Sequence, residues 1–188
     1  MRVLGVDPGL TRCGVGVVEG GPGRTATLLS ADVIRTAADL ETGQRLAALE
    51  RSLVQVIAEF RPDAMAVERP FARRDVSTIV GTMQAAGVVL LVGTRAGLHV
   101  VQHTPTEVKA AITGSGRADK AQVGHMVMRI LKLDAPPRPA DAADAVALAL
   151  CHLWRAPAIQ RIEQARLRAE LAAGVAAGRA RARERSLP

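Results

Sequence analysis

The stretch that decides the fold is Val3-Leu4-Gly5-Val6-Asp7-Pro8-Gly9-Leu10-Thr11-Arg12-Cys13-Gly14. The apolar run over residues 3–6 predicts a buried strand, which ends at Asp7 and a Pro-Gly turn. A second apolar run, residues 15–18, follows at hairpin distance. A carboxylate at the end of a buried strand is costly unless a positive group meets it. Asp7 is therefore either a turn residue that caps its own loop or part of a functional site.

Composition narrows the class of protein. The chain has 188 residues, 48% of them hydrophobic, which suits one domain with a sizeable core. The formal net charge of +7 favours a polyanionic partner such as nucleic acid, although a composition that uses Arg in place of Lys gives the same charge. We expect a folded domain over residues 1–157. Residues 158–188 then form a basic Ala/Arg-rich tail, helical or partly disordered.

Several features of the sequence favour a cytoplasmic protein. Cys13 and Cys151 follow no metal-ligand spacing and are expected to be reduced, buried thiols. No signal peptide is evident, and no apolar run reaches the roughly 18 residues needed to span a bilayer.

The next part of the chain alternates strand and helix patterns. Residues 25–34 predict the third strand of an antiparallel meander, and residues 41–60 carry apolar side chains at helical spacing. A short apolar strand over residues 64–67 ends at Glu68. The strand–helix–strand order favours parallel pairing with an earlier strand, which would bring Glu68 near Asp7. Taken alone, Glu68 is equally well a solvated acid at a strand end.

Further elements follow in the second half. A helix over residues 76–95 is apolar nearly all round, so it is either buried or packed against a second copy of the chain. Residues 98–102 predict a strand. Thr104 begins a helix with a capping box, and Asp119 can cap the helix after it. The four histidines show no metal-ligand spacing and are interpreted as structural or surface residues; they are His99, His103, His125 and His152.

Two basic segments are candidates for contact with a phosphate backbone. The loop Arg69-Pro70-Phe71-Ala72-Arg73-Arg74 carries one aromatic side chain, which is either a core anchor or exposed near DNA. A later helix–loop–helix segment carries three basic residues that either face one backbone or are solvated surface charges. These are Lys109, Arg117 and Lys120.

Two more acids begin the last predicted helix. Asp141 and Asp144 are three residues apart and so share one face, although the positive end of the helix dipole would also favour them there. If they converge with Asp7 and Glu68, the four carboxylates cannot all be ionised without a counter-charge. Oxygen ligands without His or Cys point to Mg²⁺ or Mn²⁺, and two such ions can activate a water and stabilise the leaving oxygen of a phosphodiester. The residues alone thus allow a metal-dependent nuclease.

A family resemblance adds to this interpretation. Residues 5–11, Val67-Glu68 followed by Phe71, residues 104–120 and residues 139–145 together resemble the RuvC Holliday-junction resolvases, in order and spacing. The resemblance implies an α/β, RNase H-like fold: a mixed five-stranded sheet, an antiparallel meander plus parallel strands, flanked by helices on both faces. It also implies a crossover junction endodeoxyribonuclease that resolves four-way junctions by paired symmetric nicks during homologous recombination and DNA repair.

The resemblance also assigns roles to residues and partners. It makes the four acids catalytic and metal-binding: Asp7, Glu68, Asp141 and Asp144. We expect two Mg²⁺ per active site, with Mn²⁺ as a substitute. Phe71 matches an aromatic that stacks on an unpaired base, and Lys109 and Lys120 match DNA-contacting positions. Arg73, Arg74 and Arg117 are further candidates for DNA binding. The expected partners are junction DNA, a second copy of the chain, a branch-migration helicase motor and its junction-binding adaptor.

Three other functions remain open from the sequence. Asp7, Gly9 and Thr11 also match the phosphate-binding turn of actin-like ATPases and sugar kinases, but neither a second such turn nor an adenosine loop is evident. A non-catalytic junction-binding module would be expected to lose one of the four acids. A related nuclease acting on RNA or transposon ends is disfavoured by the Phe71 loop and the Asp141–Asp144 pair.

Overall fold

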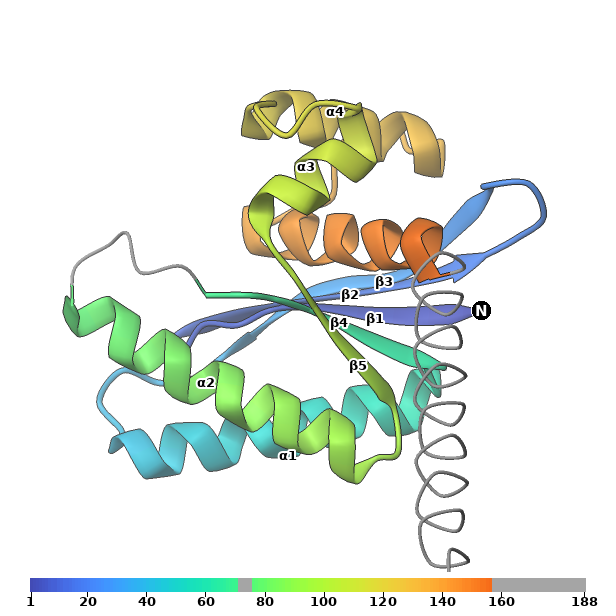
Figure 1. Cartoon of the computed structure of the whole chain (residues 1–188). Helices are drawn as coiled ribbons and strands as arrows, with labels where there is room; N and C mark the ends of the chain where they lie inside the picture. The colour runs from blue at the N-terminus through green and yellow to red at the C-terminus, as the bar shows by residue number, and fades with distance from the viewer. Residues whose placement is uncertain (71–75, 157–188) are drawn as a thin grey trace, which may run out of the picture. The chain divides into compact units, whose positions relative to one another are not determined.

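The computed structural model describes residues 1–70 and 76–156. The described residues form one five-stranded sheet in the order β3-β2-β1-β4-β5 (Figure 1). Its strands are β1 (Arg2–Asp7), β2 (Arg12–Gly20), β3 (Ala26–Arg35), β4 (Ala64–Glu68) and β5 (His99–His103). β1, β2 and β3 are antiparallel neighbours, whereas β4 pairs parallel with both β1 and β5. The predicted mixed sheet is confirmed.

Helices cover both faces of this sheet (Figure 1). One face carries α1 (Thr42–Phe60) and α2 (Val76–Arg95). The other carries α3 (Pro105–Thr113), α4 (Lys120–Leu131) and an unlabelled helix over residues 140–156, drawn in orange. This last helix is called helix 140–156 below. The expectation of a sheet flanked by helices on both faces is also confirmed.

The period-2 alternation of the strands supplies both cores. On β1, Val3 packs into the cluster that includes Val146 and Leu148 of helix 140–156. The next residue, Leu4, packs into the opposite cluster with Leu49 of α1. The central strands are therefore buried on both faces, as expected of a parallel pair covered by helices.

Several local predictions from the sequence hold. The side-chain oxygens of Thr104 and Asp119 accept bonds from the N3 backbone N–H groups of α3 and α4, and both capping boxes are complete. The strand expected over residues 98–102 lies one residue later, as β5. Cys13 and Cys151 are both buried, and they are not joined in a disulfide.

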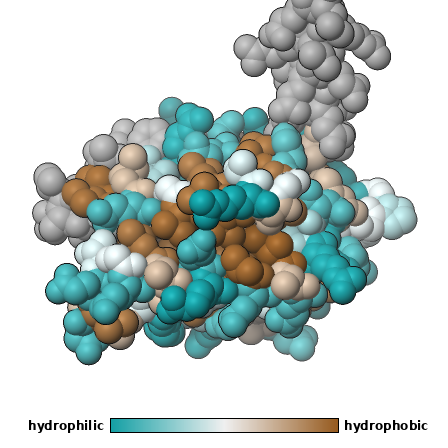
Figure 2. Space-filling view, turned by 90° about the horizontal axis from the view of Figure 1, so that it is seen from below, coloured by the Kyte–Doolittle hydropathy of each residue, from teal (hydrophilic) through white to brown (hydrophobic). Residues whose placement is uncertain are grey.

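For α2, the sequence left open whether its apolar side chains are buried in the core or available to a second copy of the chain, and the structure shows some of each. Ala85 and Val89 are buried in the core, whereas Val80, Met83 and Leu91 are exposed. Figure 2 shows an apolar patch on the face of the molecule that α1 and α2 cover. Within the described part of the chain, no helix is both long and apolar enough to cross a membrane.

Some predictions fall on residues outside this description. Phe71, Arg73 and Arg74 are among them, as is the predicted tail at 158–188. Residues Met1–Trp154 form one compact unit. The predicted domain boundary after residue 157 stays a prediction.

Candidate active site

The candidate site lies at the carboxyl ends of β1 and β4. The register pairs Val6 with Val67, so the next residues, Asp7 and Glu68, end neighbouring parallel strands. Alternation places both carboxylates on the face that helix 140–156 covers, because Val6 and Val67 belong to the opposite core cluster. The parallel pairing inferred from element order thus brings two acids, 61 residues apart in the sequence, to one edge of the sheet.

Glycines let helix 140–156 lie close enough to add its own acids. A Cβ placed on Gly5 would lie 1.9 Å from the carbonyl oxygen of Ala145. One on Gly14 would lie 2.1 Å from the carbonyl oxygen of Asp141. Since no larger residue fits these contacts, the backbone of the helix rests directly on β1 and β2. The first turn of the helix, with Asp141 and Asp144, therefore lies beside Asp7.

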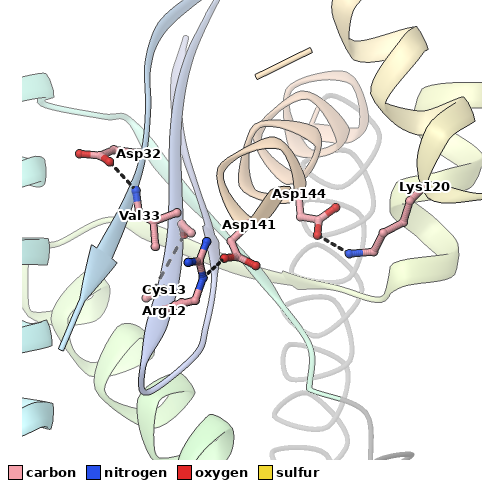
Figure 3. A network of polar contacts seen from close by, with 8 residues as sticks. Arg12, Cys13, Asp32, Val33, Lys120, Asp141 and Asp144 are labelled. Atoms are coloured by element: carbon pink, nitrogen blue, oxygen red, sulfur yellow. Dashed lines mark hydrogen bonds and ion pairs between the residues drawn. The ribbon is translucent and has the colours of Figure 1, made fainter. Parts of the chain in front are cut away.

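Each helix acid is paired with a cation from another element (Figure 3). Arg12 Nε, at the start of β2, donates to Asp141 Oδ2 at 2.6 Å. Lys120 Nζ, at the start of α4, donates to Asp144 Oδ2 at 2.8 Å. The bond to Asp144 raises the pKa of Lys120, so the ammonium stays charged at neutral pH.

Electrostatics show that the four acids share one environment. Burial, together with the negative charges of three neighbouring carboxylates, raises the pKa of Asp7 to about 7. Those neighbours are, in decreasing effect, Glu68, Asp144 and Asp141. Lys120 opposes them only in part. The centre of the cluster is thus short of positive charge, as expected of a cation-binding site.

The turn that follows Asp7 is fixed by a side chain of α1. Arg45 donates from Nη2 to Thr11 Oγ1 at 2.7 Å and from Nε to Thr36 Oγ1 at 3.0 Å. The Thr36 hydroxyl in turn donates to the carbonyl oxygen of Leu10. This network connects α1 to the turn between Asp7 and Arg12 and limits the movement of both.

The donor set fits a hard divalent cation in its chemistry. All four acids offer carboxylate oxygens, the ligands that Mg²⁺ and Mn²⁺ prefer, and Asp7 lacks a full counter-charge. As the side chains stand, no three His, Cys, Asp or Glu residues in the described ranges lie close enough together to hold an ion. Two of the carboxylates are bonded to Arg12 and Lys120 instead. Each of these bonds engages one carboxylate oxygen, so an ion at this site would compete with Arg12 and Lys120 for those oxygens.

The predicted basic residues of the α3–α4 segment differ in their exposure and contacts. Arg117 is exposed and Lys109 is half-buried. Lys120, predicted to contact phosphate, is bonded to Asp144 and is thus part of the acid cluster. Arg12 and Arg45 were not singled out by the sequence. For Arg12, the one indication in the sequence of a place at the site is that it follows the Asp-Pro-Gly turn within five residues of Asp7. The sequence offers no such indication for Arg45.

Two histidines form a buried pair next to this region. His103 ends β5, paired in register with Glu68, and its Nε2 lies 3.3 Å from Nδ1 of His152. Both rings are almost fully buried. Burial, with smaller contributions from His103 and His99, lowers the pKa of His152 to about 4, so that His152 is neutral at pH 7. The structural interpretation of these histidines agrees with this packing.

The sheet order, the helices on both faces and the acids at the ends of the central strands define the RNase H-like fold of a class of nucleases. The family model described as crossover junction endodeoxyribonuclease RuvC matches residues 3–152. The chain belongs to that family.

Individual relatives agree with this assignment. The crossover junction endodeoxyribonuclease RuvC of Streptomyces avermitilis is 62% identical over 165 residues, which cover 88% of this chain and 94% of that protein. The structure of T. thermophilus RuvC in complex with Holliday junction substrate is similar with a TM-score of 0.79 and 38% identity, covering 83% of this chain and 94% of that one. The yeast mitochondrial Holliday junction resolvase Ydc2 shares the fold at 13% identity, with a TM-score of 0.61 over 79% of this chain and 76% of that one.

Proposed function

We propose that this chain is a metal-dependent endonuclease that resolves four-way DNA junctions by paired, symmetric nicks. The observation that carries the proposal is the gathering of four carboxylates, from β1, β4 and helix 140–156, at one edge of an RNase H-like sheet. The relatives support the choice of substrate, since T. thermophilus RuvC was solved with a Holliday junction. Cytoplasmic location and a role in recombination and repair accompany this proposal.

In this proposal Asp7 is the central ligand, because it is buried and its pKa responds to the charges of all three other carboxylates. Glu68, Asp141 and Asp144 surround it and complete the oxygen donor set. Mg²⁺, with Mn²⁺ as a substitute and two ions per site, would supply Lewis-acid activation of water and of the leaving oxygen when bound. The chain's own contribution is to hold the four carboxylates on three rigid elements and to keep Asp7 largely away from solvent.

The basic residues serve to hold the DNA. Lys109 lies on α3, and Arg117 lies between α3 and α4. Because α4 begins with Lys120, which is bonded to Asp144, phosphates bound along this segment would lie beside the acids. Phe71, Arg73 and Arg74, which follow β4 in the sequence, are proposed to contact the junction as well. Phosphate contacts give affinity without sequence information, whereas an aromatic stacked on a base adds about 1–3 kcal/mol.

A second copy of the chain is the proposed partner of the α1–α2 face. This face carries four exposed apolar side chains: Val54 on α1, and Val80, Met83 and Leu91 on α2. Two symmetric nicks in a junction also require two active sites related by a two-fold axis. The branch-migration motor and its adaptor remain proposed partners on the strength of the family resemblance.

A synthetic four-way junction tests the proposal. The purified protein is incubated with the junction, and separately with linear duplexes of the same arms, in Mg²⁺ and in EDTA. The proposal expects nicks at symmetric positions on two opposing strands, ends that a ligase reseals, and no cutting in EDTA. Equal cutting of the linear duplexes would indicate a general nuclease. Binding of the junction without any cutting would indicate the non-catalytic alternative.

A further inference from the structure

The arginine after the Asp7 turn holds a carboxylate that belongs to the proposed metal site. Arg12 Nε lies 2.6 Å from Asp141 Oδ2, a short bond between two charged groups. The two residues are 129 positions apart, so the contact depends on the close approach of helix 140–156 to β2. Figure 3 shows the guanidinium and the carboxylate facing each other at the start of that helix.

A guanidinium and a divalent cation both bind through the lone pairs of this carboxylate's oxygens. A carboxylate oxygen bonded to an N–H at this distance has that lone pair directed at the arginine and not at an ion. Positive charge so close to the site also lowers its attraction for a second cation. The pair is only moderately buried, with side chains 42% and 32% exposed, so the arginine is free to swing into solvent.

We infer that Arg12 is an internal counter-ion that competes with the divalent cation for Asp141. Its guanidinium occupies Asp141 in the ion-free protein, weakens ion binding, and leaves the carboxylate when an ion binds. This inference rests on the proposed function, because it takes Asp141 as one of the metal ligands. Arg12 is therefore a residue that sets ion affinity through Asp141.

Metal binding in the absence of DNA tests the inference. The dissociation constants of Mn²⁺ and Mg²⁺ are measured by calorimetry for the wild type, Arg12→Gln and Arg12→Lys at low salt. Because an exposed ion pair changes an equilibrium only modestly, Arg12→Gln should bind either ion about two- to five-fold more tightly than the wild type. Arg12→Lys, which keeps the charge, should remain near the wild type. The difference should shrink at about 1 M monovalent salt, where the charge is screened.

Two controls connect the effect to Asp141. Arg95, whose guanidinium pairs with Glu50 at 3.6 Å far along α2, is the matched exposed arginine, and Arg95→Gln should leave ion affinity unchanged. In an Asp141→Asn background, Arg12→Gln should tighten binding clearly less than it does in the wild type, since the shared carboxylate is gone and only the repulsion by the arginine's charge is relieved. Melting temperatures in EDTA show whether each variant is folded.

Unchanged or weaker ion binding by folded Arg12→Gln would overturn the inference, because Arg12 would then orient Asp141 for the ion instead of competing with it. The same tightening in the Asp141→Asn background would overturn it too. A wild type that binds no ion at all would end both this inference and the proposed metal site. Tightened ion binding in a protein that leaves junctions uncut would overturn only the proposed function.

Discussion

Gly14 on β2 and Asp141 on helix 140–156 are in backbone contact, so close that a Cβ on Gly14 would lie 2.1 Å from the carbonyl oxygen of Asp141. This contact sets how near the helix lies to the sheet. It therefore also sets how near Asp141 and Asp144 lie to Asp7. A residue without chemistry of its own thus controls the geometry of the proposed active site.

Gly14→Ala should reduce junction cutting by about 10²-fold, because the start of the helix must move by the order of 1 Å. It should also lower the free energy of unfolding by about 1–3 kcal/mol, the usual cost of overpacking. Single-turnover cutting and urea denaturation measure the two effects. Gly43→Ala, where an added Cβ meets nothing within 4 Å, is the control and should cut normally. Full activity of Gly14→Ala would mean that the helix position does not matter.

Arg45→Ala should slow cutting more than it weakens junction binding. The variant loses the bonds that hold Thr11 and Thr36, so the turn between Asp7 and Arg12 becomes less well positioned. We expect a decrease of about ten-fold in the cutting rate, with binding within about two-fold. Gel shift and single-turnover cutting at one salt concentration separate the two. Equal losses in both would show that Arg45 serves DNA binding instead.

Asp7→Asn should stabilise the ion-free protein at pH 8. The pKa of Asp7 in the folded protein is about 7, above the ordinary 3.8, so the folded state binds this proton more tightly than the unfolded chain does. Stability due to this group therefore falls as pH rises from about 4 to 7, and the full cost applies above pH 7. The substitution should raise the free energy of unfolding by about 2–4 kcal/mol at pH 8 in EDTA. The gain should vanish towards pH 4.

Urea denaturation of both proteins at several pH values checks this prediction. Added Mg²⁺ should stabilise the wild type and have little effect on Asp7→Asn, because the central ligand is lost. A gain in stability that does not change with pH would rule out the charge on Asp7 as its cause.

His152 should make the protein sensitive to mild acid. Its pKa is lowered to about 4 in the folded protein, whereas in the unfolded chain it lies near 6.5. The unfolded state thus binds the proton more tightly, and stability is lost as pH falls from about 6.5 to 4. The total loss due to this group is about 3 kcal/mol. His152→Gln should flatten the pH dependence in this range, whereas His125→Gln, at an exposed position, should not. The same slope in His152→Gln would assign the sensitivity to other groups.

Much of the fold could be predicted because its signals are local. Strand ends at Asp7 and Glu68 follow from apolar runs that stop at a charge, and the capping boxes at Thr104 and Asp119 follow from residue types at fixed spacing. Parallel pairing of β4 with β1 follows from the order of elements. These rules need no knowledge of the tertiary structure.

The missed features all depend on tertiary contacts. Arg12 pairs with a carboxylate 129 residues away, and Arg45 bonds to Thr11 and Thr36, 34 and 9 residues away. No helix or strand spacing rule connects these positions. Lys120 could be recognised as basic, but its bond to Asp144 depends on how α4 lies beside helix 140–156. The burial of His103 and His152 likewise arises only when β5 and that helix meet.

The central claim is that the clustered carboxylates are needed for cutting and not for holding the DNA. The most direct measurement compares wild type and Asp7→Asn on one four-way junction, with binding followed by gel shift and nicking followed in Mg²⁺. The account predicts that Asp7→Asn binds the junction as well as the wild type does and produces no nicks, because the basic surface is intact and the central ligand is gone. Nicking by Asp7→Asn at the wild-type rate would contradict it.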